Sequence, residues 1–211
     1  EWPIKRATDT KYFLHSNGKA NTRYGDGYLS VSPPSNEPFD VYLYNPNDPV
    51  PTTGGALCCN PYFVRNGAFD QSVIENRSDV LVYTTPRLEA DIEVTGPVQV
   101  HLEISSSAKD TDFTAKLIDV CPPNEDYPDG FHMNLTDSIM RARYRNSWEK
   151  EELMTPGEIY SLNFELYPTG NLFKSGHKIR VDISSSNFPR FDINPNTGGP
   201  LGVDQSKIIA L

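Results

Sequence analysis

The sequence predicts an all-β fold in which two sheets pack face to face as a sandwich. The main observation is the stretch 98–120, where apolar and polar side chains alternate over 98–104 and again over 113–119, on either side of a polar loop. A third alternating run, at 177–183, has the same β-branched character. Apolar sheet faces of this kind need a second layer to cover them. We therefore expect one core that contains Ile104, Leu117, Val181 and Ile183.

Alternating runs near the N-terminus predict three short strands, at 11–15, 27–31 and 39–44. The first two should be edge or peripheral strands, because a turn-rich segment separates them and a Pro-Pro pair ends the second. Prolines and a glycine pair then exclude regular structure over 45–55, which we expect to cross a surface in extended form.

The middle of the chain adds one strand at 80–84, and before it an apolar loop at 57–63 that should pack onto something. After the central strands, turn residues predict a hairpin connection at 122–130. The chain should return as a strand over 136–144, with Ile139 inward and the arginines outward.

The C-terminal third predicts one short helix at 146–154, which Pro156-Gly157 would end. The remaining elements expected are a strand at 159–166, a turn at 171–176, a core strand at 177–184 and a loop at 188–202. The total of about eight to ten strands with long connections favours a jelly roll over a barrel. We expect residues 1–211 to form a single domain.

Composition excludes two classes of partner. The chain has 211 residues and a net charge of −9, from 19 Lys and Arg against 28 Asp and Glu. This charge argues against nucleic acid and against an anionic membrane surface as the main partner. The apolar runs are far too short to span a bilayer, and the first ten residues lack the apolar core of a signal peptide. The linker-like start leads us to expect that the chain belongs to something longer.

The cysteines point to a reducing compartment. Cys58, Cys59 and Cys121 cannot all pair, and neighbouring cysteines rarely bond each other. We therefore expect a cytoplasmic rather than a secreted location. The glycosylation-type triplets that begin at Asn76 and Asn134 point the other way, but such triplets are common by chance.

The sequence carries no recognisable catalytic motif. A Gly-x-Ser-x-Gly elbow is absent, and Ser175 near His177 lies in a polar turn where nothing would activate a hydroxyl. The four histidines, His15, His101, His132 and His177, are scattered without zinc-ligand spacing, so no metal is expected. Asp110, Asp112, Asp119 and Asp129 could offer oxygen ligands to calcium, but without the spacing of a dedicated loop.

Three long motifs carry a family resemblance that covers residues 2–199. They are DVLVYTTPRLEADIEVTGPVQVHLEISSSAKDTDFTAKLIDVCP, DSIMRARYR and PGEIYSLNFELYPTGNLFKSGHKIRVDISSSNFPRFDINPNTG. In this order they resemble the C-terminal domain of the CocE/NonD hydrolases, the group of Xaa-Pro dipeptidyl-peptidases, cocaine esterase and α-amino-acid ester hydrolases. The resemblance implies a jelly-roll β-sandwich of the galactose-binding-domain-like type, with residues 1–10 as the linker from a preceding α/β-hydrolase domain.

The resemblance also implies a function. The catalytic serine, aspartate and histidine of such enzymes lie in the hydrolase domain, so this chain would be a non-catalytic domain without cofactor. It would stabilise the hydrolase and cap domains of the same polypeptide and wall part of the acyl pocket, where a small ester or peptide binds; a homo-oligomer is possible.

The same resemblance singles out Leu57, Cys58 and Cys59, which follow the Gly54-Gly55 pair, as the edge of that acyl pocket. The alternative for these three residues is that Leu57 packs into the sandwich and the cysteines act as small apolar fillers. The alternative for the whole chain is an independent carbohydrate-binding jelly roll, since it holds 11 Tyr and two Trp, Trp2 and Trp148.

Overall fold

The regular secondary structure is almost entirely strand, and long loops connect the strands. The computed structural model describes residues 4–57, 62, 65–203 and 206–211. Its elements are β1 (Phe13–His15), β2 (Tyr28–Ser30), η1 (Ile74–Asn76), β3 (Leu81–Thr84), β4 (Ile92–Ile104), β5 (Asp112–Cys121), β6 (Phe131–Arg141), η2 (Ala142–Tyr144), β7 (Tyr160–Phe173) and β8 (Lys178–Ser184). Both helices are single 3-10 turns. The predicted all-β fold is therefore confirmed.

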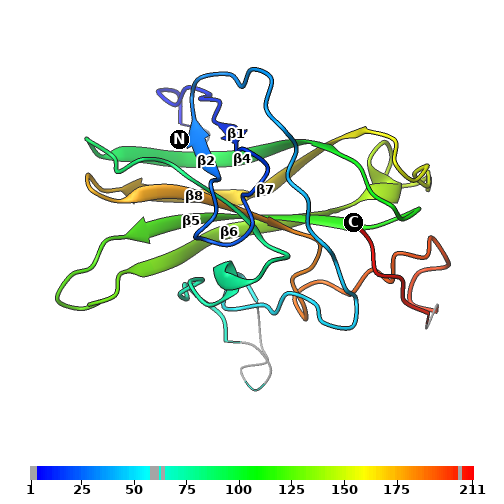
Figure 1. Cartoon of the computed structure of the whole chain (residues 1–211). Coiled ribbons are helices and arrows are strands. Elements are labelled where there is room, and N and C mark those ends of the chain that lie inside the picture. The colour runs from blue at the N-terminus through cyan, green and yellow to red at the C-terminus, as the bar shows by residue number, and fades with distance from the viewer. Residues whose placement is uncertain (1–3, 58–61, 63–64, 204–205) are drawn as a thin grey trace.

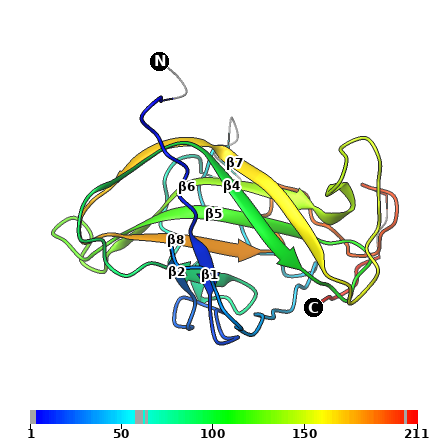
Figure 2. The ribbon, with the colours of Figure 1, turned by 90° about the horizontal axis from the view of Figure 1, so that it is seen from above.

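The strands form two sheets (Figure 1). Six strands pair in the order β1, β2, β3, β8, β5, β6, and β4 pairs with β7 in a second sheet. All neighbours are antiparallel except β2 and β3, which are parallel. Seen from above, the long β4 and β7 lie over the larger sheet (Figure 2). This arrangement is sandwich-like, and the finer jelly-roll designation stays a prediction.

The main core lies between the two sheets. β4 and β7 contribute alternate side chains, and β5, β6 and β8 contribute the facing ones. Its members include Leu102, Ile104, Phe113, Ala115, Leu117, Met140, Leu162, Phe164, Leu166, Ile179 and Ile183, with Val181 packed against them. The four core residues expected from the sequence thus meet in one cluster.

The outer face of β5 is also buried, which the alternating pattern did not indicate. Ile118 is completely buried and Lys116 is 4% exposed. The segment before β3 covers this side of the larger sheet, and its Val50 and Ile74 pack with Val80 and Val82 in a second apolar cluster. Polar side chains on this face are satisfied in pairs, as where Thr114 and Ser184 hydroxyls lie 2.6 Å apart. β5 is therefore buried on both faces.

The predicted strand at 39–44 is wrong. Its side chains do alternate, with Tyr42 and Tyr44 inward and Phe39 exposed, but the only ladder contact that it makes with the described residues is a single bridge from Tyr44 to Ala210. Side-chain bonds hold the segment instead. The Asp40 carboxylate accepts hydrogen bonds from the Ala20 amide at 2.8 Å and the Tyr83 hydroxyl at 2.7 Å.

The predicted helix at 146–154 is also wrong. Its backbone amides bond to distant carbonyls, Glu152 to Arg143 and Met154 to Lys109, each at 2.8 Å. These bonds replace the local ladder that a helix needs. No helix in the described part of the chain has the length and apolar character that a bilayer span requires.

The orientation predicted for residues 136–144 is wrong as well. Met140 rather than Ile139 enters the core, because Met140 stands opposite Phe113 on the inner face. Arg143 points inward and is 1% exposed. The Asp110 carboxylate balances its charge and accepts a hydrogen bond from Arg143 Nε at 2.8 Å. The turn expected at 171–176 begins later, because β7 continues to Phe173.

The core assignment yields a direct stability test. Leu117→Ala should lower the free energy of unfolding by about 2–5 kcal/mol, since it removes buried methyl groups between the sheets. Lys109→Ala, at an exposed position, should cost less than about 0.5 kcal/mol. Chemical denaturation of both variants measures the difference, and equal stability losses would contradict the core described here.

Candidate functional site

The Gly54-Gly55 pair shapes the loop that carries Leu57. Both glycines have positive φ, +67° and +100°, a region that residues with a side chain rarely adopt. A Cβ on Gly54 would lie 2.5 Å from the Gly67 carbonyl oxygen. The loop is closed at its base, because Gly55 and Gly67 exchange two backbone hydrogen bonds of 2.7 and 3.0 Å. The glycines are therefore needed for the turn that presents Leu57.

Leu57 lies at an open hollow of about 380 Å³. The lining residues are Ala56, Leu57, Tyr167, Arg190 and Phe191. Leu57 is half-buried there and is not part of the core between the sheets. The alternative that Leu57 packs into the sandwich is therefore wrong, whereas Cys58 and Cys59 lie outside the described residues.

Arg190 forms the polar wall of this hollow. Its guanidinium lies 5.6 Å from the ring centre of Tyr167 and 5.2 Å from that of Phe191. It also pairs with Asp137 at 2.9 Å, although both side chains are less than a tenth exposed. The second Asp137 oxygen accepts a hydrogen bond from Asn187 at 3.0 Å. Stacking and pairing together fix the position of the arginine.

A buried amide anchors the loop to β5. Gln71 is completely buried, and its Nε2 donates to the Thr53 carbonyl at 2.8 Å, just before the glycine pair. Its Oε1 accepts a hydrogen bond from the Lys116 ammonium at 3.1 Å. One side chain therefore connects the outer face of β5 to the backbone that holds Leu57.

The same outer face carries a buried network of charges. Arg180 pairs with Glu75 of η1, and Glu75 also contacts His132. Asp182, which stands beside Lys116 in the ladder, is 3% exposed, and neither of its oxygens has a hydrogen-bond partner among the described residues. Burial raises the pKa of the Asp182 carboxyl well above its usual range. The negative charge of the nearby Glu75 raises this pKa further, whereas the positive charges of Arg180 and Lys116 lower it in part.

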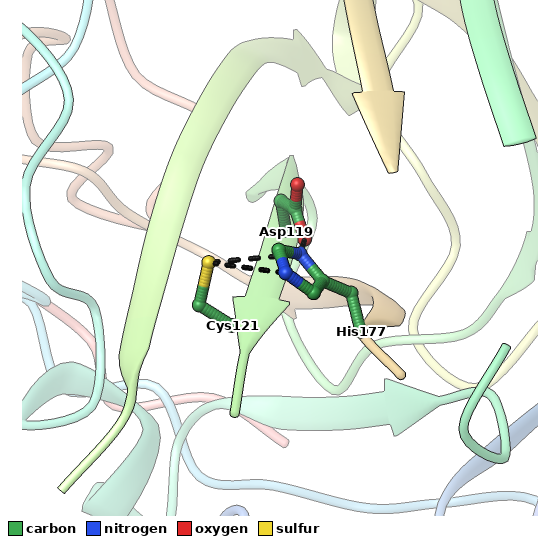
Figure 3. Close-up of side chains that lie close together, drawn as sticks. All are labelled: Asp119, Cys121 and His177. Atoms are coloured by element: carbon green, nitrogen blue, oxygen red, sulfur yellow. Dashed lines mark hydrogen bonds and ion pairs between the residues drawn. The ribbon is translucent and has the colours of Figure 1, made fainter. Parts of the chain in front are cut away.

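A third group of polar side chains lies at the end of β5 (Figure 3). Asp119 Oδ1 is 2.8 Å from His177 Nδ1, and Cys121 Sγ is 3.6 Å from the same nitrogen. Burial, with a contribution from Asp119, raises the pKa of the Cys121 thiol, so this cysteine is not an activated nucleophile. Sequence spacing gave no sign of this group, because its members meet only through strand pairing.

Comparison with known proteins assigns the family. The model of the family described as "X-Pro dipeptidyl-peptidase C-terminal non-catalytic domain" matches residues 1–210. The chain belongs to this family. The chain matches one part of larger hydrolases, as expected for a member of this family. It spans between a fifth and about a third of the length of the relatives named below.

Two relatives and two solved structures illustrate the similarity. The chain is 45% identical over 205 residues to cocaine esterase of Rhodococcus sp. (strain MB1 Bresler), covering 97% of this chain and 34% of that protein. It is 27% identical over 128 residues to a putative Xaa-Pro dipeptidyl-peptidase of Bacillus anthracis, covering 61% and 20%. An α-amino acid ester hydrolase structure superposes with a TM-score of 0.82 at 28% identity, covering 97% of this chain and 33% of that one. An aminopeptidase of a marine-sediment Thaumarchaeota archaeon gives 0.78 at 27% identity, covering 95% and 34%.

The structure explains the non-catalytic description at Ser175, which stands two residues before His177 in the sequence. The Ser175 hydroxyl donates to the backbone carbonyls of Leu88 at 3.4 Å and Glu89 at 3.1 Å, and its amide donates to Asp91. His177 turns away to Asp119. The predicted structural turn at Ser175 is therefore confirmed.

Two of the four aspartates that were considered as calcium ligands are paired with arginines. Asp110 and Asp112 pair with Arg143 and Arg141, each at 2.8 Å, so their charges are balanced by side chains of the domain. Asn194 donates to both carboxylates. These two aspartates serve to fix loops together.

Sequence reasoning missed the hollow's other lining residues. Tyr167 and Phe191 are far apart in the chain, and the sequence of residues 188–202 predicts only a loop. The one signal was local: Arg190 lies between a proline and a phenylalanine in a segment otherwise rich in small polar residues. The hollow beside Leu57 therefore includes three side chains that spacing did not indicate.

The raised pKa of Asp182 predicts how the stability of the domain changes with pH. Because its folded-state pKa is raised above the unfolded value, the carboxyl favours folding at low pH, and this contribution is lost as the pH rises through the folded-state pKa. Asp182→Asn should therefore gain stability relative to the wild type as the pH rises above about 4, the ordinary range of Asp.

Denaturation midpoints between acidic and neutral pH measure this trend. Asp126→Asn, an exposed carboxylate in the turn between β5 and β6, serves as the control for removing one charge. A wild-type-to-Asp182→Asn difference that stays constant with pH would contradict the assignment.

Proposed function

We propose that this chain acts as a non-catalytic wall of a serine hydrolase whose α/β-hydrolase and cap domains belong to the same polypeptide. The family match supports this, as does the small share of each relative's length that the chain spans. The relatives' names support a small ester or a short peptide as the substrate class. The same support favours this function over an independent sugar-binding module.

The observation that carries the proposal is the loop that carries Leu57. Its glycine turn and its tie to Gln71 hold an apolar side chain at the rim of an open hollow. Aromatic and aliphatic surfaces of this kind suit the acyl part of a substrate, while a fixed guanidinium limits polar contacts. The chain would therefore set the size of the acyl pocket and leave bond cleavage to the catalytic domain.

We also propose a reducing, cytoplasmic setting. Cys121 is a free cysteine, which is usual where thiols are kept reduced. The charge of the chain fits neither nucleic acid nor membrane as a partner.

The isolated 211-residue chain should not hydrolyse an activated aryl ester or a Xaa-Pro anilide. It offers no activated nucleophile at Ser175, whose hydroxyl is already a donor to carbonyls. Steady-state assays of the wild type and Ser175→Ala should both match the buffer rate. Turnover by either protein would contradict the non-catalytic role, and loss of that turnover in Ser175→Ala would identify the nucleophile.

Leu57 should govern acyl selectivity in the polypeptide that carries the catalytic domain. Leu57→Trp should lower kcat/KM for esters with a bulky acyl group by about tenfold relative to acetyl esters, because pocket volume is worth that much in discrimination. Leu57→Ala should shift the ratio the other way.

Leu172→Trp is the matched control, since Leu172 is an exposed leucine on β7 that does not line the hollow. Selectivity that changes equally in the Leu57 and Leu172 variants would rule out a pocket role for this loop.

A further inference from the structure

Backbone pairing brings Asp119, Cys121 and His177 together. Asp119 and Cys121 are two residues apart on β5, so their side chains point to the same face. The β5–β8 register pairs Asp119 with Ile179 and Val120 with Lys178. Continued by one residue, this register sets His177 opposite Cys121. The grouping therefore follows from the strand ladder.

The three side chains offer one ligand atom each within a small volume. Their ligand atoms all lie within 4.8 Å of one another, and the side chains face one another (Figure 3). Zinc bonds of about 2.0–2.3 Å in tetrahedral geometry separate pairs of ligand atoms by roughly 3.3–3.7 Å. The separation of 3.6 Å between Cys121 Sγ and His177 Nδ1 fits this range, and that of 2.8 Å between Asp119 and His177 would widen by about half an ångström.

A further residue orients the carboxylate. Asp119 is 2% exposed, and its Oδ2 accepts a hydrogen bond from Asn171 Nδ2 at 3.0 Å. This leaves Oδ1 directed at His177. Outer partners of this kind position the ligands of metal sites in proteins.

We propose that Asp119, Cys121 and His177 form a binding site for a single zinc ion at the end of β5, with one coordination position left open. Thiolate, imidazole and carboxylate are zinc ligands, and the sulfur disfavours magnesium and calcium. On binding, the Cys121 thiol releases its proton to solvent, and the His177 proton resides on Nε2 so that Nδ1 can bind the ion.

Cys121 also lines a second hollow of about 170 Å³, whose wall carries Arg87, Lys178 and Arg180 together with Asp129 and His132. The positive charges in this wall oppose a bare divalent ion, and Asp129 and the two negative ligands offset that repulsion. The site thus resembles zinc sites that keep one exchangeable position.

Cobalt binding tests this site directly. In a Cys58→Ser, Cys59→Ser background, Cys121 is the only thiol of the 211-residue chain. After treatment with a chelator, titration with Co²⁺ should produce a thiolate-to-cobalt charge-transfer band that saturates at one ion per chain. Zinc should abolish the band by competition. Added Cys121→Ser should remove the band, and His177→Asn or Asn171→Ala should weaken zinc binding by at least about tenfold.

A control separates this site from surface binding. His101→Asn changes an exposed histidine on β4 and should leave both stoichiometry and affinity unchanged. Circular dichroism checks that each variant is folded. Absence of the band in the Cys58→Ser, Cys59→Ser protein would overturn the proposal without any further variant. So would zinc binding of unchanged affinity in Cys121→Ser or His177→Asn.

Discussion

The rest of the structure depends on the burial of β5 on both faces. Its inner face needs only apolar partners, which β4 and β7 supply. Its outer face carries Thr114, Lys116 and Ile118, so the covering segment must bring both apolar bulk and hydrogen-bond partners. Gln71 meets the second need and, through the Thr53 carbonyl, fixes the loop that presents Leu57. The need of the buried Lys116 side chain for a hydrogen-bond partner thereby helps to position the loop that presents Leu57.

Charge pairs perform a similar task at the edges of the sandwich. Arg143 with Asp110, and Arg190 with Asp137, are nearly inaccessible to solvent, and each joins segments far apart in sequence. Removing one partner of such a pair leaves an uncompensated buried charge, which costs far more than an exposed pair contributes. The long loops of this domain are therefore held in place by specific pairs, and Arg190 serves both the loop packing and the wall of the hollow.

Much of the fold could be predicted from the sequence, because alternation within a strand is a local property. The strands at 113–119 and 177–184 were expected near their observed bounds, whereas β4 begins at Ile92, six residues before the alternating run at 98–104. The errors arose where distant partners decide the outcome. The segment at 39–44 alternates like a strand but forms a single bridge with the described residues. The Glu152 amide donates to the Arg143 carbonyl instead of to a carbonyl within a helix.

The candidate site was less predictable. Leu57 was identified by family resemblance, whereas Tyr167, Arg190 and Phe191 converge on it from the other side of the chain. Asp119 and His177 likewise meet only when β5 pairs with β8. Spacing in sequence carries no information about such contacts.

The central claim, that position 57 borders the acyl pocket of a catalytic domain, can be measured most directly by covalent mapping. The polypeptide containing that domain would be treated with a serine-directed inhibitor whose acyl group carries a photoreactive diazirine, then irradiated, digested and analysed by mass spectrometry. Our account predicts cross-links in the peptide that contains Gly54, Gly55 and Leu57, and their loss when the nucleophile is blocked beforehand. Cross-links confined to the hydrolase and cap domains would contradict it.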